Sequence, residues 1–146
     1  MAGNARSRPA TAADLPAVEA LLAAEGLPTG GVGEILTHFR VMEDGHRVIA
    51  AAGIEPHGVS ALLRSVVVAP EHRGRGLARR LSEDMLRHAR ELGCEALYLL
   101  TLDAEGYFAE LGFTRIERDQ APDAIRTCRQ YREQCPDTAV LMRLAL

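Results

Sequence analysis

The stretch that decides the fold runs from Val66 to Leu81 and reads VVVAPEHRGRGLARRL. Its three consecutive valines are typical of a buried strand, and a proline follows them closely. Gly74 and Gly76 then lead into an amphipathic segment whose apolar residues recur at helical spacing. The stretch therefore predicts a strand, a tight glycine loop and a helix N-terminus in immediate succession.

Such a loop is typical of an anion-binding site, because a helix N-terminus leaves backbone N–H groups unpaired at the positive end of the helix dipole. Gly74 and Gly76 allow a phosphate group to approach closely, and Arg73, Arg75 and Arg79 add positive charge. The sequence has no GxxxxGK[ST] motif and lacks the third glycine of the dinucleotide fingerprint, so ATP and NAD are not expected. The alternative is a simple turn followed by a solvated helix face; we favour a diphosphate site.

Strands and helices alternate along the rest of the chain. Strand patterns occur at Phe39–Glu43, Arg47–Ile54, Ser60–Val68, Ala96–Thr101, Phe113–Glu117 and Thr138–Leu144. Helix patterns occur at Asp14–Gly26, Glu34–His38, Leu77–Leu92, Glu105–Leu111 and Pro122–Gln134. The run ALYLLT at 96–101 is apolar throughout, which predicts a central strand covered on both faces. The sequence thus predicts an α/β fold around one mixed sheet.

Composition and charge indicate how many domains the chain forms and which partners are not expected. With 146 residues, 47% hydrophobic and 25% charged, the chain is expected to form one domain over residues 1–146. A formal charge of -3 and no broad basic face disfavour nucleic acid as a partner. No run approaches the ~20 apolar residues of a membrane span, and the first residues lack a signal-peptide core. We therefore expect a cytoplasmic protein without a membrane partner.

The three cysteines, Cys94, Cys128 and Cys135, fit no CxxC pattern, so a disulfide framework is not expected. Buried packing is the favoured interpretation. Cys128 and Cys135 are seven residues apart and would share one face of a continuous helix, which leaves a soft-metal or arsenic contact as the alternative. No metal cofactor is expected.

The segment Arg73–Ala78 also resembles the [Q/R]-x-x-G-x-[G/A] signature of the GCN5-related N-acetyltransferases (GNAT family). RPATAADLPAVEALL is similar to the family's opening strand and helix, and YFAELGF to its helix that ends in G-F. The resemblance implies acetyl-CoA as cosubstrate and a single α/β (α+β) domain. It also implies a mixed, mostly antiparallel sheet of about six to seven strands, flanked by helices and splayed at the acetyl-CoA cleft.

The resemblance assigns coenzyme contacts residue by residue. It implies that the backbone at Arg73, Gly74, Arg75, Gly76, Leu77 and Ala78 holds the pyrophosphate, with Arg79 beside it. It further implies that the main chain of Val66, Val67 and Val68 pairs with the pantetheine arm. Strands Ser60–Val68 and Ala96–Thr101 would splay apart to admit the thioester.

The general acid is ambiguous. Many family members have a tyrosine four residues before the glycine of G-F, and here that position is Phe108, beside the coenzyme, with Tyr107 next to it. One residue rotates a helical side chain by about 100°, so Tyr107 is either a displaced acid or a packing aromatic.

Glu55 and His57 lie at an expected bend between two strands and are candidates for the base, since a carboxylate or an imidazole there can reach an amine directly or through water. A simple polar turn is the other interpretation of EPHG. Arg64 interrupts the apolar run LLRSVVV, where a buried charge needs either an ion-pair partner or a functional role. It is therefore either part of a structural ion pair or a contact for an anionic substrate.

GIEPHGVSALLRSVVVAPEHRGRG and the tail AIRTCRQYREQCPDTAVLMR resemble more closely the ArsN-type acetyltransferases of arsenic-resistance operons. This implies acetyl transfer to the primary amine of a small molecule, an amino acid that carries an anionic arsenic or phosphorus group. The alternative function is a non-catalytic module of the same fold that senses acyl-CoA or an arsenical. The apolar C-terminal strand either pairs across a homodimer or lies inside the sheet.

Overall fold

A seven-stranded sheet organises the chain, with strand order β1-β2-β3-β4-β5-β7-β6. The computed structural model describes residues 5–128, 131 and 138–146. The strands are β1 (Ala5–Pro9), β2 (Phe39–Asp44), β3 (Arg47–His57), β4 (Ser60–Val68), β5 (Ala96–Thr101), β6 (Thr114–Ile116) and β7 (Val140–Ala145). Only the β4–β5 pair of this sheet is parallel. The predicted mixed, mostly antiparallel sheet is confirmed.

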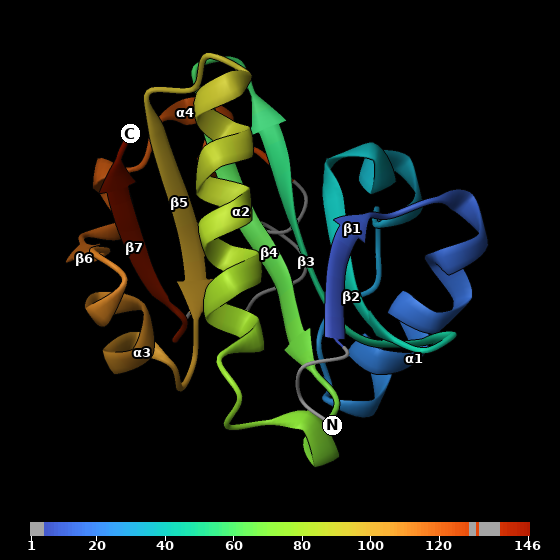
Figure 1. Cartoon of the computed structure of the whole chain (residues 1–146). Coiled ribbons are helices and arrows are strands. Elements are labelled where there is room, and N and C mark those ends of the chain that lie inside the picture. Colours follow the sequence, from blue (N-terminus) through green and yellow to red (C-terminus); the bar gives the residue numbers. More distant parts are fainter. Residues whose placement is uncertain (1–4, 129–130, 132–137) are drawn as a thin grey trace.

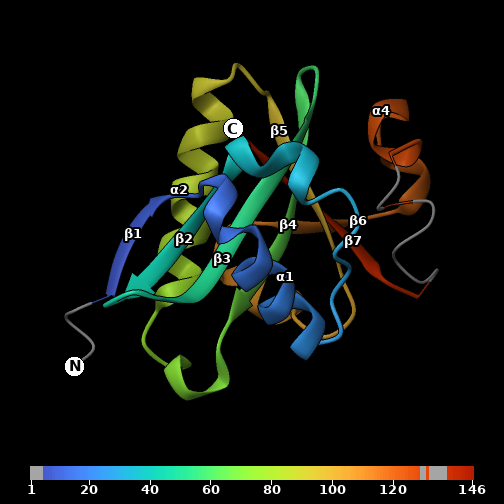
Figure 2. The ribbon, with the colours of Figure 1, turned by 90° about the vertical axis from the view of Figure 1, so that its right-hand side faces the viewer.

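Helices cover both faces of the sheet. They are α1 (Leu15–Ala24), α2 (Leu77–Glu91), α3 (Glu105–Glu110) and α4 (Asp123–Arg126), with 3₁₀ turns η2 (Ala12–Asp14), η3 (Gly33–His38), η4 (Pro70–His72) and η5 (Arg118–Gln120). Figures 1 and 2 show α2 on one face, with α1 and α4 on the other. The buried face of α2 includes Leu77, Leu81 and Met85, the predicted apolar stripe. None of the described helices is long and apolar enough to cross a membrane.

The cleft between β4 and β5 begins where their pairing ends. The two strands pair only from Ser60 to Leu62 on β4, opposite Ala96 to Tyr98 on β5. Ser65 has a φ of 61°, and the β3–β4 register shifts between Ala51 and Gly53. A bulge with a left-handed residue bends its strand, so β4 turns away from β5 beyond this point. The predicted splay is confirmed.

The sheet differs from prediction at the β3–β4 hairpin. Glu55, Pro56 and His57, expected as a bend, extend β3 and pair with β4 as far as His57 opposite Ser60. The pairing of β3 with β2 ends at Gly53, so Pro56 lies on a stretch with only one neighbouring strand. Proline, which lacks an N–H, is tolerated at such an edge.

Two helices lie within the segments predicted for them. α1 begins at Leu15, and its N-cap is Asp14, the first residue of the predicted segment; Thr11 and Asp14 also form a capping box around η2. The helix predicted from Pro122 to Gln134 contains α4, while residues 129–130 and 132–134 lie outside the described residues, as does Cys135.

The C-terminal strand lies inside the sheet. β7 pairs with β5 on one side and with β6 on the other. Of the two interpretations of this strand, the internal position is confirmed, and its backbone is not an edge that could pair with a second chain.

Candidate active site

A cavity of about 1000 Å³ lies between the splayed strands. Its walls come from the loop that follows α1, from β4 and β5, and from α3 with the segment that leads into it. Single residues of the glycine loop, of the start of α2 and of the segment before β7 complete the lining. They include Leu27, Pro28, Arg64, Ser65, Val66, Val67, Val68, Arg73, Ala78, Leu100, Thr101, Tyr107 and Phe108. The parting of β4 and β5 thus creates one continuous space through the sheet.

The β4 wall presents main chain as well as side chains. Val66, Val67 and Val68 line the cavity, and β4 has no pairing with β5 beyond Leu62. Backbone groups on that edge are therefore available to a ligand, which would pair with β4 as an added strand does. This geometry suits the contacts that the resemblance implied for the pantetheine arm.

The glycine loop ends in a group of unpaired amides. Gly74 and Gly76 have φ values of 80° and 75°, a left-handed backbone that glycine adopts without strain. In the part of the chain that the structure describes, the amides of residues 74–79 donate to no protein acceptor, whereas Arg80 N donates to Gly76 O at 3.1 Å. These N–H groups lie at the positive end of the α2 dipole, an arrangement that suits an anion such as a phosphate group.

The loop arginines already have partners. Arg73 forms an ion pair with Glu25, which follows α1. Arg75 contacts His72 Nδ1 at 3.1 Å, and Arg79 lies 3.7 Å from Glu83 on the next turn of α2. Among the predicted loop residues, Arg73 and Ala78 line the cavity, and Gly74, Arg75, Gly76, Leu77 and Arg79 lie beyond its lining. The loop therefore lies at one end of the cavity.

Tyr107 and Phe108 both reach the cavity from the first turns of α3. Phe108 is 8% exposed and packs edge-on against Phe113, with ring centroids 5.9 Å apart. Tyr107 is 40% exposed and packs edge-on against Phe108 at 5.2 Å. Burial raises the pKa of the Tyr107 hydroxyl, Arg79 partly opposes this, and Glu83 adds to it. Tyr107 therefore holds its proton at neutral pH.

Arg64 lies at the other end of the β4 wall, 3% exposed and in contact with the cavity. Its Nη1 donates to Glu55 Oε1 at 3.2 Å, and its Nε donates to Ser65 Oγ at 3.1 Å. Glu55 Oε2 is 2.7 Å from His57 Nε2. Arg64 is thus both ion-paired and part of the wall, whereas Glu55 and His57 are outside the residues that line the cavity.

Some of the wall was not predicted from the sequence. Glu25, Leu27 and Pro28 come from the loop after α1, where the sequence offered only the signal of a glycine-rich stretch. Cys94 is buried on the α2 face of the sheet and is outside the lining, and burial raises the pKa of its thiol. A thiol so placed is a poor nucleophile for the cavity.

Solved structures share this fold. The chain superposes on N-acetylglutamate synthase from Neisseria gonorrhoeae, complexed with coenzyme A and N-acetyl-glutamate, with a TM-score of 0.83 and 20% identity over 97% of this chain and 35% of that one. It superposes on Rv2747 from Mycobacterium tuberculosis, in complex with CoA and NLQ, with a TM-score of 0.82 and 21% identity over 97% of this chain and 99% of that one.

Sequence comparison also finds acetyltransferases among the relatives of this chain. An amino-acid acetyltransferase of Pseudomonas syringae pv. syringae is 33% identical over 98 residues, 66% of this chain, and the match covers 23% of that protein's length. The family model described as Acetyltransferase (GNAT) family matches residues 20–113, more than half of the chain. The predicted enzyme class, an N-acetyltransferase that uses acetyl-CoA, is confirmed at the level of the family. With its splayed sheet and amide-lined glycine loop, the chain belongs to the GNAT family of acetyltransferases.

Proposed function

We propose that this protein transfers the acetyl group of acetyl-CoA to the primary amine of a free amino acid. The observation that carries the proposal is one cavity that connects the region of the amide-lined glycine loop with a buried arginine, Arg64. Similarity supports the substrate class, because the Pseudomonas syringae relative is an amino-acid acetyltransferase and the gonococcal structure holds N-acetyl-glutamate.

The loop and β4 would hold the coenzyme. The amides of residues 74–79 suit the two phosphates, and the unpaired edge of Val66–Val68 suits the amide groups of the pantetheine arm. Binding along this edge leads the acyl end toward the middle of the cavity, between β4 and β5. The bound coenzyme supplies an activated thioester, and the chain supplies its position and orientation.

Attack by the amine forms the new C–N bond, and the C–S bond then breaks. The nitrogen loses one proton and the departing thiolate gains one. Tyr107 would donate the proton to the thiolate, because its hydroxyl is protonated and its side chain is part of the cavity wall. The base assignment of Glu55 and His57 stays a prediction; since neither lines the cavity, a proton from the amine would reach them only through water.

Arg64 would bind the carboxylate of the amino acid. A guanidinium that is 3% exposed meets little competition from water, so a charge-assisted hydrogen bond to it is strong. Glu55 accepts from Nη1 of Arg64 at 3.2 Å and the carbonyl oxygen of Pro28 accepts a long hydrogen bond from Nη2 at 3.5 Å, and these contacts fix the plane of the guanidinium group. Glu55 is then a positioning residue for Arg64.

A thiol-release assay over a panel of amines tests the proposal. We expect turnover with free amino acids, including glutamate and glutamine, and little with amines that lack a carboxylate. Arg64→Gln should raise the KM for the amino acid about 10- to 100-fold, because a hydrogen bond to a charged group contributes roughly 1.5–3 kcal/mol. The Kd for acetyl-CoA should be unchanged.

Arg115→Gln is the matched control, since Arg115 is an exposed arginine on β6 that pairs with Glu105 at 3.6 Å. Acetyl-CoA binding without turnover on any amine would contradict the enzymatic proposal and favour a non-catalytic sensing module. Equal turnover of amines with and without a carboxylate would contradict the proposed role of Arg64.

The finer assignment to the ArsN type rests on the sequence resemblance. It predicts that phosphinothricin and arsinothricin, amino acids with an anionic phosphorus or arsenic group, are better substrates than glutamate. Including both compounds in the amine panel decides this. A homodimer and a cytoplasmic location also stay predictions.

A further inference from the structure

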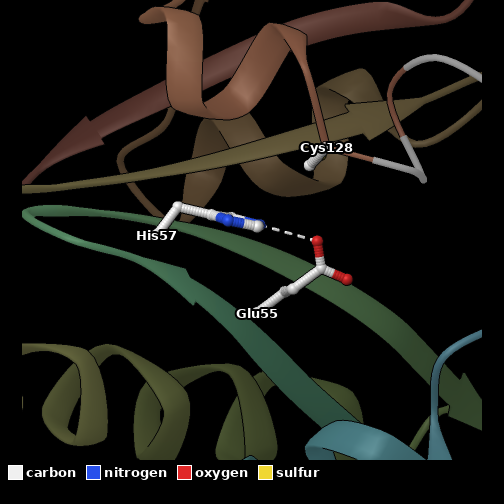
Figure 3. A group of neighbouring side chains, drawn as sticks. All are labelled: Glu55, His57 and Cys128. Atoms are coloured by element: carbon white, nitrogen blue, oxygen red, sulfur yellow. Dashed lines mark hydrogen bonds and ion pairs between the residues drawn. The ribbon is translucent and has the colours of Figure 1, made fainter.

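Three side chains of types that can bind metal ions converge on the sheet face opposite α2. Glu55 and His57 are two residues apart on β3 and so point to the same face, and Cys128 follows α4 (Figure 3). Their potential ligand atoms all lie within 4.8 Å of one another. Across residues 5–128, 131 and 138–146, no other three His, Cys, Asp or Glu side chains converge in this way.

The cluster is partly buried and lies against an apolar part of the protein. Cys128 is 6% exposed and belongs to the apolar cluster that includes Leu62, Tyr98 and Ile125. The side chains of Glu55 and His57 are 14% and 26% exposed, so the cluster opens to solvent on the His57 side. A metal ion bound there would have protein on one side and a free coordination position on the other.

The donor set indicates the class of metal. One thiolate, one imidazole and one carboxylate are the ligands of zinc and similar divalent transition metals, whereas Ca²⁺ and Mg²⁺ take oxygen ligands. The two anionic ligands would balance the two charges of the ion. The three side chains therefore match a borderline-soft divalent cation in both atom type and charge.

The distances are compatible with coordination after small side-chain rotations. Ligand atoms around one tetrahedral zinc lie about 3.3–3.6 Å apart. Here Glu55 Oε2 and His57 Nε2 are 2.7 Å apart, and all three ligand atoms lie within 4.8 Å. The other oxygen of Glu55 accepts a hydrogen bond from Arg64 at 3.2 Å, the kind of outer contact that orients a ligating carboxylate.

We propose that Glu55, His57 and Cys128 form a binding site for a divalent transition metal ion of the zinc class. The ion would connect the end of β3 to the segment after α4, two regions more than 70 residues apart in the sequence. None of the three residues lines the acetyl-CoA cavity, and the site borders the acetyl-transfer machinery only through Glu55, which also contacts Arg64. The proposal does not depend on the proposed substrate.

Titration of chelator-treated protein with Co²⁺ tests the site directly, since a cobalt–thiolate bond gives a charge-transfer absorption band that other ligands do not. We expect one equivalent of Co²⁺ to develop the band, Zn²⁺ to displace it, and Zn²⁺ alone to raise the Tm. Cys128→Ser should abolish the band, and His57→Gln should weaken binding of both ions at least tenfold.

Cys94→Ser is the matched control, because Cys94 is also a buried cysteine but lies on the α2 face, where its Sγ donates to Gly58 O at 3.8 Å. It should leave the band and the Zn²⁺ affinity unchanged. Circular dichroism of each metal-free variant checks folding; if Cys128→Ser does not fold, the loss of affinity in His57→Gln decides the question.

Two results would overturn the proposal. The first is the absence of a charge-transfer band in the parent protein at saturating Co²⁺. The second is a band that survives in Cys128→Ser and disappears in Cys135→Ser, which would assign the thiolate to the other cysteine. Acetyl-transfer activity is measured separately, so a protein that binds no metal but acetylates amino acids would refute this site and leave the proposed function intact.

Discussion

Glu25 pairs with Arg73 and would compete with the proposed coenzyme for it. The two side chains form an ion pair between the end of α1 and the glycine loop, and they are 29% and 53% exposed. A pair this exposed contributes at most about 1 kcal/mol, a factor of about five in binding. The contact is therefore weak enough for a diphosphate to displace.

Glu25→Gln should raise the affinity for acetyl-CoA by about two- to fivefold, because it releases Arg73 and removes a negative charge near the phosphates. Isothermal titration calorimetry at low salt measures the change. Glu91→Gln, with the same change of charge at the far end of α2, should leave the Kd unaltered. An unchanged or weaker Kd in Glu25→Gln would show that the ion pair does not oppose binding.

Tyr107→Phe tests the general acid. If the hydroxyl protonates the leaving thiolate, kcat should fall by about 10²-fold with little change in the Kd for acetyl-CoA. Because the pKa of Tyr107 is raised, the parent should keep this step up to a pH above the ordinary tyrosine value of 10.0. Steady-state kinetics across this range measures both effects.

Tyr98→Phe is the control, since the Tyr98 hydroxyl accepts from Arg143 Nε at 3.3 Å and does not line the cavity. Equal kcat values for Tyr107→Phe and the parent would assign proton donation to solvent and leave Tyr107 as a packing aromatic.

At the scale of elements, a histidine pair joins η3 to α2. His38 Nδ1 lies 3.0 Å from His88 Nε2, with the ring centroids 5.3 Å apart. Burial lowers the pKa of His88, and the charges of His38 and Arg40 lower it further, against the opposing effect of Glu91. The folded protein therefore keeps His88 neutral at pH values where the unfolded chain protonates it.

The sign of the pH effect follows from this difference. Below the ordinary histidine value of 6.5, the unfolded state binds the extra proton and the free energy of unfolding falls as the pH falls. His88→Gln should flatten the dependence of Tm on pH between about pH 5 and 7. His46→Gln, at an exposed histidine in the β2–β3 turn, should keep the parent slope. Parallel Tm curves for the parent and His88→Gln would contradict the assignment.

Elements were predictable from the sequence where a single local pattern of residues determines the secondary structure. The apolar run 96–101 forms the predicted central strand, and the predicted apolar stripe through Leu81 and Met85 forms the buried face of α2. Boundaries were less predictable where a distant segment decided them. Pro56 continues β3 in a stretch where β2 no longer pairs with it, since that pairing ends where Gly53 lies opposite Phe39. Gly53 in turn leaves room for the Phe39 ring, which occupies the space that a Cβ would need.

At the scale of the whole molecule, the splayed sheet leaves a cavity of about 1000 Å³ that a ligand would bridge. Acetyl-CoA should stabilise the protein, because it would contact β4, α2 and α3 together. At 100 times its Kd it should add about 2.7 kcal/mol to the free energy of unfolding, or about 10 °C in Tm for a chain of this size. Thermal denaturation with and without the ligand measures the shift.

AMP, which lacks both the diphosphate and the pantetheine arm, is the comparison ligand and should shift Tm only slightly at the same concentration. An unchanged Tm at millimolar acetyl-CoA would contradict the assignment of the cavity to the coenzyme.

The sequence by itself determined the strand–loop–helix unit at 66–81, because its β-branched residues, its glycines and its helical stripe act over neighbouring positions. The tertiary structure alone decided that Glu25 pairs with Arg73, that Tyr107 shares the cavity with Phe108, and that Cys128 joins Glu55 and His57. These contacts depend on how strands and helices distant in the chain pack together. No local pattern of residues encodes such distances, since each depends on register, bulges and packing summed over the whole sheet.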